Sequence, residues 1–209
     1  MKPVFILFWI LLSINLLGQS YTPFINSNSI ILDSIVNNNN NNNSSESIQL
    51  DAPTVTDIDG NVYNTVTIGT QTWMKENLKT TKLNDGSDIT QISDNSIWGF
   101  YTSKAYCWYN NDKITYKDTY GAIYNLSTVA TRKLCPIGWH VPSDNEWSIL
   151  AKNLGGANVA GAKLKESGTL HRTAPNSEAT NGSGFTALPG GYRINNYGTF
   201  DDLTHKGYW

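Results

Sequence analysis

The sequence has few charged residues and no excess of either sign, which excludes several classes of partner. Only 15% of its 209 residues are charged, and the formal net charge at pH 7 is −2. Lys and Arg are scattered along the chain without forming a basic block. Because this pattern gives no electrostatic basis for binding nucleic acid or an anionic membrane surface, we expect neither as a partner.

Groups suited to catalysis are also scarce. The chain has three histidines and two cysteines, whereas a protein metal site usually takes three or four ligands. The sequence has no Gly-x-Ser-x-Gly, His-Glu-x-x-His or glycine-rich phosphate loop. We therefore predict no catalytic, cofactor or metal site, and we expect that the protein is not an enzyme. Trp, Tyr, Asn, Gly and Thr are abundant instead, which is typical of an extracellular β-rich domain.

Residues 1–20 have the organisation of a signal peptide. Lys2 precedes an apolar run at residues 4–17, and Gly18-Gln19-Ser20 is a small-x-small cleavage pattern. The alternative is an uncleaved anchor, but the run is shorter than the ~20 residues of a spanning helix, and Asn15 interrupts it. No cysteine follows to carry a lipid. We predict a secreted or cell-surface protein with no membrane insertion after cleavage.

Residues 21–52 lack any sustained periodicity and include a run of Asn at 37–43. Such a segment cannot bury a core, so we predict a disordered Asn/Ser-rich linker. An ordered domain is expected at residues 53–209. Asp59-Gly60, between alternating apolar and polar residues, predicts a two-residue β-hairpin turn. The core residues predicted just after it are Trp73, Met74 and Leu78.

Aromatic side chains are concentrated between residues 98 and 124, with amides and a carboxylate among them. Sugar sites use this combination, because apolar sugar faces stack on rings and sugar hydroxyls need planar hydrogen-bond partners. The alternative is that most of these rings belong to the core, since Trp and Tyr have large areas to bury. The candidate ligand-binding residues are Trp108, Tyr109, Asn110, Asn111 and Asp112.

The segment GWHVPSDNEW at residues 138–147 places His140 close to two carboxylates, which suggests a metal or catalytic site. However, Ser143 is followed three residues later by Glu146, the pattern of a capping box, in which each side chain accepts from the other residue's backbone N–H. Apolar residues then recur at helical spacing from Trp147. We therefore predict that this segment starts a helix capped by Ser143 and Glu146, and that it holds no metal.

Five blocks of the sequence, in this order, resemble the Fibrobacter succinogenes major paralogous domain: DIDGNVYNTVTIGTQTWMKENLKT, YCWYNND, YGAIYN, LCPIGWHVPSDNEW and GFTALPGGYR. The resemblance covers about residues 54–209. That family occurs in exported bacterial proteins and has no established biochemical function. The GWHVPSD-x-EW block is also similar to a block of formylglycine-generating and C-type lectin-like folds. This implies an α+β, C-type lectin-like domain with a twisted antiparallel sheet, one or two helices and long loops.

The resemblance also bears on the C-terminus and the cysteines. Family members continue beyond Gly-Tyr-Trp with further strands and a cysteine, so the domain at 53–209 is expected to be incomplete. Export favours a disulfide between Cys107 and Cys135. The alternative is that the terminal cysteine of the complete family domain pairs with one of them.

These features together favour an exported, non-catalytic module that binds a glycan or another envelope component. Two alternatives remain open from the sequence. One is an oxidative or hydrolytic enzyme related to formylglycine-generating enzymes, in which Cys107 and Cys135 would have to bind copper. The other is a purely structural repeat in a surface array.

Overall fold

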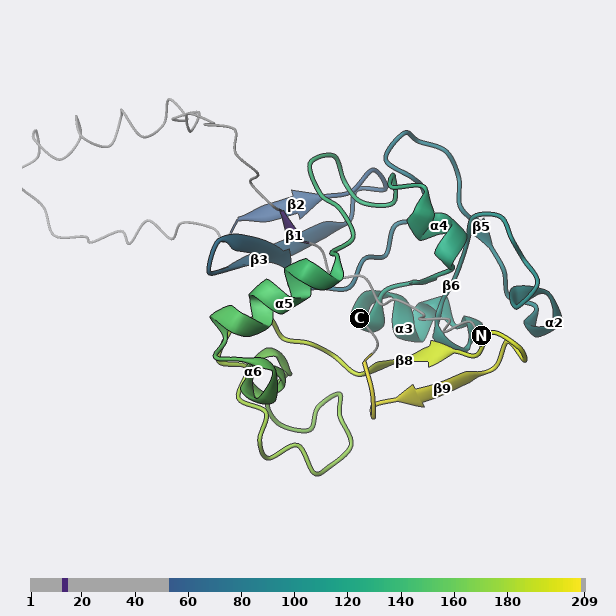
Figure 1. The fold of residues 1–209 in the computed structure, drawn as a ribbon. Coiled ribbons are helices and arrows are strands. Elements are labelled where there is room, and N and C mark those ends of the chain that lie inside the picture. The colour runs from purple at the N-terminus through teal and green to yellow at the C-terminus, as the bar shows by residue number, and fades with distance from the viewer. Residues whose placement is uncertain (1–12, 15–52, 208–209) are drawn as a thin grey trace, which may run out of the picture. The chain divides into compact units, whose positions relative to one another are not determined.

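A computed structural model of the chain describes residues 13–14 and 53–207 (Figure 1). The predicted linker at 21–52 lies outside the described residues, as does the predicted signal peptide apart from Ser13–Ile14. Those two residues form strand β1, which pairs with strand β4 (Gln71–Met74) in antiparallel register. No helix in the described part of the chain is both long and apolar enough to cross a membrane.

The first sheet has the order β1-β4-β3-β2, and all of its neighbouring strands are antiparallel. Strands β2 (Thr54–Thr56) and β3 (Val62–Ile68) form the hairpin that the sequence predicts. Its loop is longer than the predicted two residues, because Thr56 pairs with Val62. The Asp57 carboxylate closes this loop by accepting from the backbone N–H groups of Asp59 and Asn61, each at 2.9 Å.

A second sheet, β5-β6-β7, is built from short strands and is surrounded by short helices. Strand β6 pairs with β5 in parallel and with β7 in antiparallel register. The elements of this region are β5 (Thr90–Gln91), α2 (Asn95–Trp98), β6 (Ala105–Cys107), the 3-10 helix η1 (Tyr109–Asn111), α3 (Lys113–Tyr120), β7 (Ile123–Tyr124) and α4 (Leu126–Ala130).

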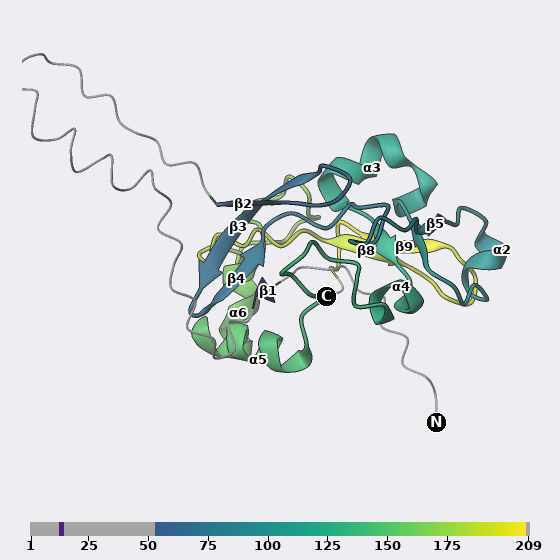
Figure 2. The ribbon, with the colours of Figure 1, turned by 90° about the horizontal axis from the view of Figure 1, so that it is seen from above.

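Helix α5 (Asp144–Asn153) has Ser143 as its N-cap, as the sequence predicts, and its capping box is present. It is followed by α6 (Ala157–Leu164). The chain ends its described part in a third sheet, the antiparallel pair β8 (Gly190–Arg193) and β9 (Phe200–Leu203). Figures 1 and 2 both place the turn of this hairpin beside α2, and Figure 2 places α3 and α4 on opposite sides of the hairpin.

This arrangement is α+β, in agreement with the class predicted from the sequence, but it differs from the expected details. The expected single antiparallel sheet is divided into three small sheets, one of which contains a parallel pair. The expected one or two helices are exceeded by α3, α5 and α6 alone. Short elements without a full period of apolar residues leave little signal in a sequence, which is why the short strands and the helices other than α5 were not predicted individually.

The core consists of three clusters of buried side chains. Trp73, Met74 and Leu78 are all buried, as predicted. Trp73 packs against Phe185 and the partly buried Trp147, with ring centroids 5.8 Å and 4.8 Å away. This contact fastens helix α5 to strand β4, and a hydrogen bond from Gln71 Nε2 to the Glu146 backbone oxygen, 3.1 Å long, reinforces it.

The two cysteines are both free, which corrects the expectation of a Cys107–Cys135 disulfide. The physical reason is that the two side chains pack into different clusters of the core. Cys107, on β6, belongs to the cluster around Trp98 and Tyr120, whereas Cys135 belongs to the cluster around Trp108. Burial raises the pKa of the Cys107 thiol to about 12 and raises the pKa of the Cys135 thiol as well.

Candidate functional site

The two predicted ligand-binding rings point into the protein. Trp108 has no exposed surface, and Tyr109 is 6% exposed. Trp108 makes an edge contact with Tyr106, while Tyr109 packs on the other cluster against Tyr116 and Phe200. Because both faces of these rings are covered by protein, neither ring offers a free face on which a sugar could stack.

The three polar residues that follow shape the backbone. Asn110 and Asn111 both have positive φ angles, 50° and 58°, a conformation that asparagine tolerates better than most residues. The Asn111 side chain donates to the Ser93 backbone oxygen over 2.8 Å. Asp112 is the N-cap of α3, where its carboxylate accepts from the Thr115 N–H at 3.0 Å. The structure therefore does not gather residues 108–112 on one surface.

The capping box of α5 includes His140, whose role the sequence left open. The Glu146 carboxylate accepts from the Ser143 N–H at 2.7 Å with one oxygen, and its other oxygen lies 2.6 Å from His140 Nε2. Burial would raise the pKa of Glu146, but the hydrogen bonds from Ser143 and His140 together lower it. Glu146 is therefore a buried carboxylate held in its charged form at the start of the helix.

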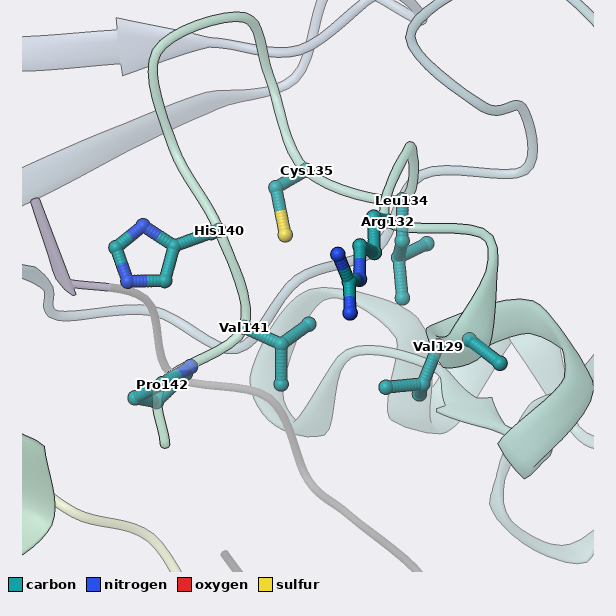
Figure 3. A pocket seen from close by; sticks show the side chains of 8 residues that line it. Val129, Arg132, Leu134, Cys135, His140, Val141 and Pro142 are labelled. Atoms are coloured by element: carbon teal, nitrogen blue, oxygen red, sulfur yellow. The ribbon is translucent and has the colours of Figure 1, made fainter. Parts of the chain in front are cut away.

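A cavity of about 430 Å³, here called the apolar cavity, lies beside His140 (Figure 3). Figure 3 shows Val129 and Leu134 on one side, His140 and Pro142 on the other, and the Cys135 sulfur between them. Its described lining residues are Val129, Ala130, Arg132, Leu134, Cys135, His140, Val141 and Pro142.

The described lining residues of the apolar cavity do not form a set of groups suited to catalysis. The raised pKa of the Cys135 thiol keeps this thiol protonated at neutral pH, and a protonated thiol is a poor nucleophile. The His140 ring already contacts Glu146. No cluster of three or more His, Cys, Asp or Glu that could hold a metal ion occurs among the described residues.

A second cavity, of about 420 Å³, lies where α5, α6 and the segment after β9 meet. It is called the basic cavity, because several cationic side chains line it and no acidic one does among the residues that the structure describes. These lining residues are Trp147, Gly161, Leu164, Lys165, Arg172, Phe185, Ala187, His205, Lys206 and Gly207.

Arg172 is the most unusual of these residues, because part of its guanidinium has no partner. Its Nη1 donates to the His205 backbone oxygen over 2.7 Å. Its Nε is buried and has no hydrogen-bond partner. Burial lowers the pKa of Arg172, and the nearby Glu166 carboxylate opposes this effect. A buried donor without an acceptor is costly, so this atom needs an explanation.

Sequence reasoning did not find the basic cavity. Four separate parts of the chain build it: Trp147, residues 161–172, residues 185–187 and residues 205–207. Long-range backbone bonds bring such segments together, for example Thr173 N–H to the Thr204 oxygen and Gly191 N–H to the Lys206 oxygen, both 2.9 Å. The one available signal is a cation, Arg172, in the segment TLHRTAPN. That signal gives no location for the side chain.

Comparison with known proteins gives one match. Residues 66–209, well over half of the chain, match the family described as Fibrobacter succinogenes major domain. The chain belongs to this family. The match begins inside β3 and contains the lining residues of both cavities. No curated protein matches the chain, and no solved structure matches it.

Proposed function

We propose that this member of the Fibrobacter succinogenes major domain family is an exported, non-catalytic binding module. Its proposed ligand is a glycan or another component of the cell envelope, and its proposed location is the cell surface or the medium. The N-terminal apolar run and its cleavage pattern support export. The similarity of the GWHVPSD-x-EW block supports the further proposal that its α+β domain is C-type lectin-like.

The basic cavity is the observation that supports binding most strongly. The partly exposed Trp147 ring lines it, and the buried Phe185 ring packs against Trp147 with a centroid distance of 6.3 Å. Polar groups of Lys165, Arg172 and His205 line it as well. Small-ligand sites have this composition, with apolar and aromatic walls and a few convergent polar groups, in cavities of about 300–1,000 Å³.

Gly161 offers a way to block the basic cavity without disturbing the fold. It lies on α6 and lines the cavity, and a Cβ placed on it would meet no atom within 4 Å. Gly161→Leu therefore puts a side chain into the space that a ligand would occupy. Since glycine costs a helix interior about 1 kcal/mol relative to alanine, this change should not lower the stability of the protein.

The experiment is a glycan array probed with the full chain and with two variants. We expect the wild type to bind one class of glycan and Gly161→Leu to lose at least about tenfold in affinity, because its side chain competes with the ligand for the same volume. Asn158→Leu is the matched control, since it adds the same side chain to an exposed position of the same helix that lines neither named cavity. Absence of binding by the wild type, or equal binding by Gly161→Leu, would contradict the proposal.

A further inference from the structure

We infer that the ligand of the basic cavity carries a carboxylate, which the unpaired edge of the Arg172 guanidinium receives. The ligand class is then acidic sugars, of which hexuronic acids are the simplest. This inference rests on the proposed function, because it names the kind of glycan that the same cavity would bind. Three observations support it: the hydrogen bonding of Arg172, the charges around the cavity and the rings beside it.

Arg172 has a pair of donors that the protein does not use. Its Nη1 is occupied by the His205 backbone oxygen, its Nε has no partner, and its Nη2 makes no hydrogen bond to any described residue. The Nε and Nη2 hydrogens lie on the same edge of a guanidinium and form a planar fork. Such a fork binds the two oxygens of a carboxylate through two parallel hydrogen bonds.

Hydrogen bonds fix the segment that holds Arg172, while a single one holds the end of its side chain. Thr173 is bound to Thr204 through its backbone N–H at 2.9 Å and through the two hydroxyls at 2.8 Å. The single described hydrogen bond of the Arg172 side chain is the one to His205. The Arg172 Nε is buried in the protein and has no contact with solvent. Binding therefore requires the guanidinium to rotate about its hydrogen bond to the His205 oxygen, so that the Nε–Nη2 edge faces the cavity.

The charges around the cavity favour an anion. Lys165, Arg172 and Lys206 line it, and no acidic residue lines it in the described part of the chain. Lys206 is paired with Asp202 at 3.0 Å. The nearby Glu166 carboxylate accepts from the His171 ring at 2.8 Å, so its hydrogen bond is to a different side chain and not to Arg172. Arg172 and Lys165 therefore leave positive charge that the lining itself does not balance.

The partly exposed Trp147 ring favours a sugar acid over a small inorganic anion. Trp147 and Leu164, both partly exposed, line the same cavity as Arg172. Phe185 and Ala187, which are 1% and 5% exposed, add little surface to this lining. An inorganic anion has no apolar part to contact Trp147, whereas a hexuronic acid presents a carboxylate at one end and an apolar ring face beside it. A single ligand of this class fits both halves of the cavity lining.

The test uses three ligands that differ at one carbon. The full chain is titrated by NMR with methyl glucuronoside, with its neutral methyl ester and with methyl glucoside. We expect the free acid to bind at least about tenfold more tightly than either neutral ligand, because two charge-assisted hydrogen bonds form only with the carboxylate. Glucose 6-sulfate is the fourth ligand, and it presents an anion without the planar carboxylate.

Variants then assign this preference to Arg172. Arg172→Gln should reduce the affinity for the acid to that for the neutral sugars and leave the affinity for the neutral sugars unchanged. Arg172→Lys should keep only part of the preference for the acid, because an ammonium group lacks the planar fork. Lys113→Gln, an exposed change on α3 that removes the same charge away from both named cavities, is the control and should bind like the wild type.

The outcomes separate this inference from the proposed function. Equal affinity for the acid and its ester, tighter binding of the sulfate than of the acid, or an unchanged preference in Arg172→Gln would overturn the inference. If neutral glycans still bind and Gly161→Leu still blocks them, the proposed function stands without it. If no glycan of any kind binds, the inference and the glycan form of the proposed function are both wrong.

Discussion

Two arginines of this domain, Arg193 and Arg172, differ in how completely their guanidinium groups are hydrogen-bonded. This difference distinguishes a residue that stabilises the fold from one that is proposed to bind a ligand. Arg193 is completely buried in the β8–β9 hairpin and donates to four acceptors, with its guanidinium 4.5 Å from the Trp98 ring centroid and 4.8 Å from that of Phe200. Its acceptors are the Gly198 oxygen at 2.7 Å, the Ile92 oxygen at 2.6 Å, the Ser93 oxygen at 3.2 Å and Asn95 Oδ1 at 2.9 Å. Arg172, which is only partly buried, has one such bond and an unpaired Nε.

The comparison teaches that the number of satisfied donors, more than the charge, distinguishes the two roles. Arg193 connects the hairpin to the segment around the start of α2, and each of its three guanidinium nitrogens donates within the protein. Both views of the fold show these two segments side by side (Figures 1 and 2). Arg172 connects fewer segments and keeps an edge unused. A buried cation that is fully paired contributes to the fold, whereas an incompletely paired one beside a cavity is a candidate for recognition.

The largest expected effect comes from removing the fully paired arginine. Arg193→Met keeps the apolar stem but leaves four oxygens without a donor, so we expect a loss of about 4 kcal/mol in the free energy of unfolding. Urea denaturation followed by Trp fluorescence measures it. Arg193→Lys should also be strongly destabilised, because an ammonium group cannot reproduce the planar fork or stack between two rings. A change below about 1 kcal/mol would mean that the carbonyl groups find water, and that Arg193 is not what holds the hairpin.

Glu146 extends the comparison to a buried carboxylate that is also fully paired. Glu146→Gln should cost about 2 kcal/mol at neutral pH, since the charged hydrogen bonds from Ser143 and His140 are lost. The folded pKa of Glu146 lies below its ordinary value of 4.5. Its contribution is therefore complete above pH 4.5 and is lost as the pH falls through the lower folded value. Unfolding of both proteins between pH 3 and 7 tests this, and a difference that does not shrink in acid would contradict it.

Ser143 is the partner of Glu146 in the capping box and should have a smaller effect. Its hydroxyl is 3.4 Å from the Glu146 N–H and 2.9 Å from the Glu146 carboxylate. Ser143→Ala should cost about 1 kcal/mol, the usual effect of losing an N-cap. The double variant with Glu146→Gln should lose less than the sum of the two, because both changes remove part of one network. Strictly additive losses would show that the two residues act separately.

The capping box and the binding cavity also differ in how much of them a sequence reveals. Ser143 and Glu146 are three positions apart, and their interaction depends on local helix geometry alone, so the pattern predicts it correctly. The hairpin around Asp59 is local in the same way, whereas the α+β class was implied by the resemblance of the GWHVPSD-x-EW block to known folds. The basic cavity joins Trp147, Arg172 and His205 through the packing of separate segments, and no spacing encodes that. The sequence left open whether Trp108 and Tyr109 bind a ligand or belong to the core, since strands and helices of a few residues have no periodicity from which to assign an inward face, and the structure places both in the core.

The smallest expected change in stability completes the comparison, because it concerns the arginine that is proposed to bind. Arg172→Met removes one hydrogen bond to the His205 oxygen, worth about 1 kcal/mol, but it also removes a buried donor that has no acceptor, which costs a similar amount. The two effects oppose each other, so the free energy of unfolding should change by less than about 0.5 kcal/mol. The same urea denaturation as for Arg193→Met measures it, which makes the two variants a matched pair.

With methyl glucuronoside present, the wild type should unfold at a higher urea concentration than without it, and the unfolding of Arg172→Met should not change. A loss near that of Arg193→Met would instead assign Arg172 to the fold, and its unpaired edge would no longer indicate a ligand.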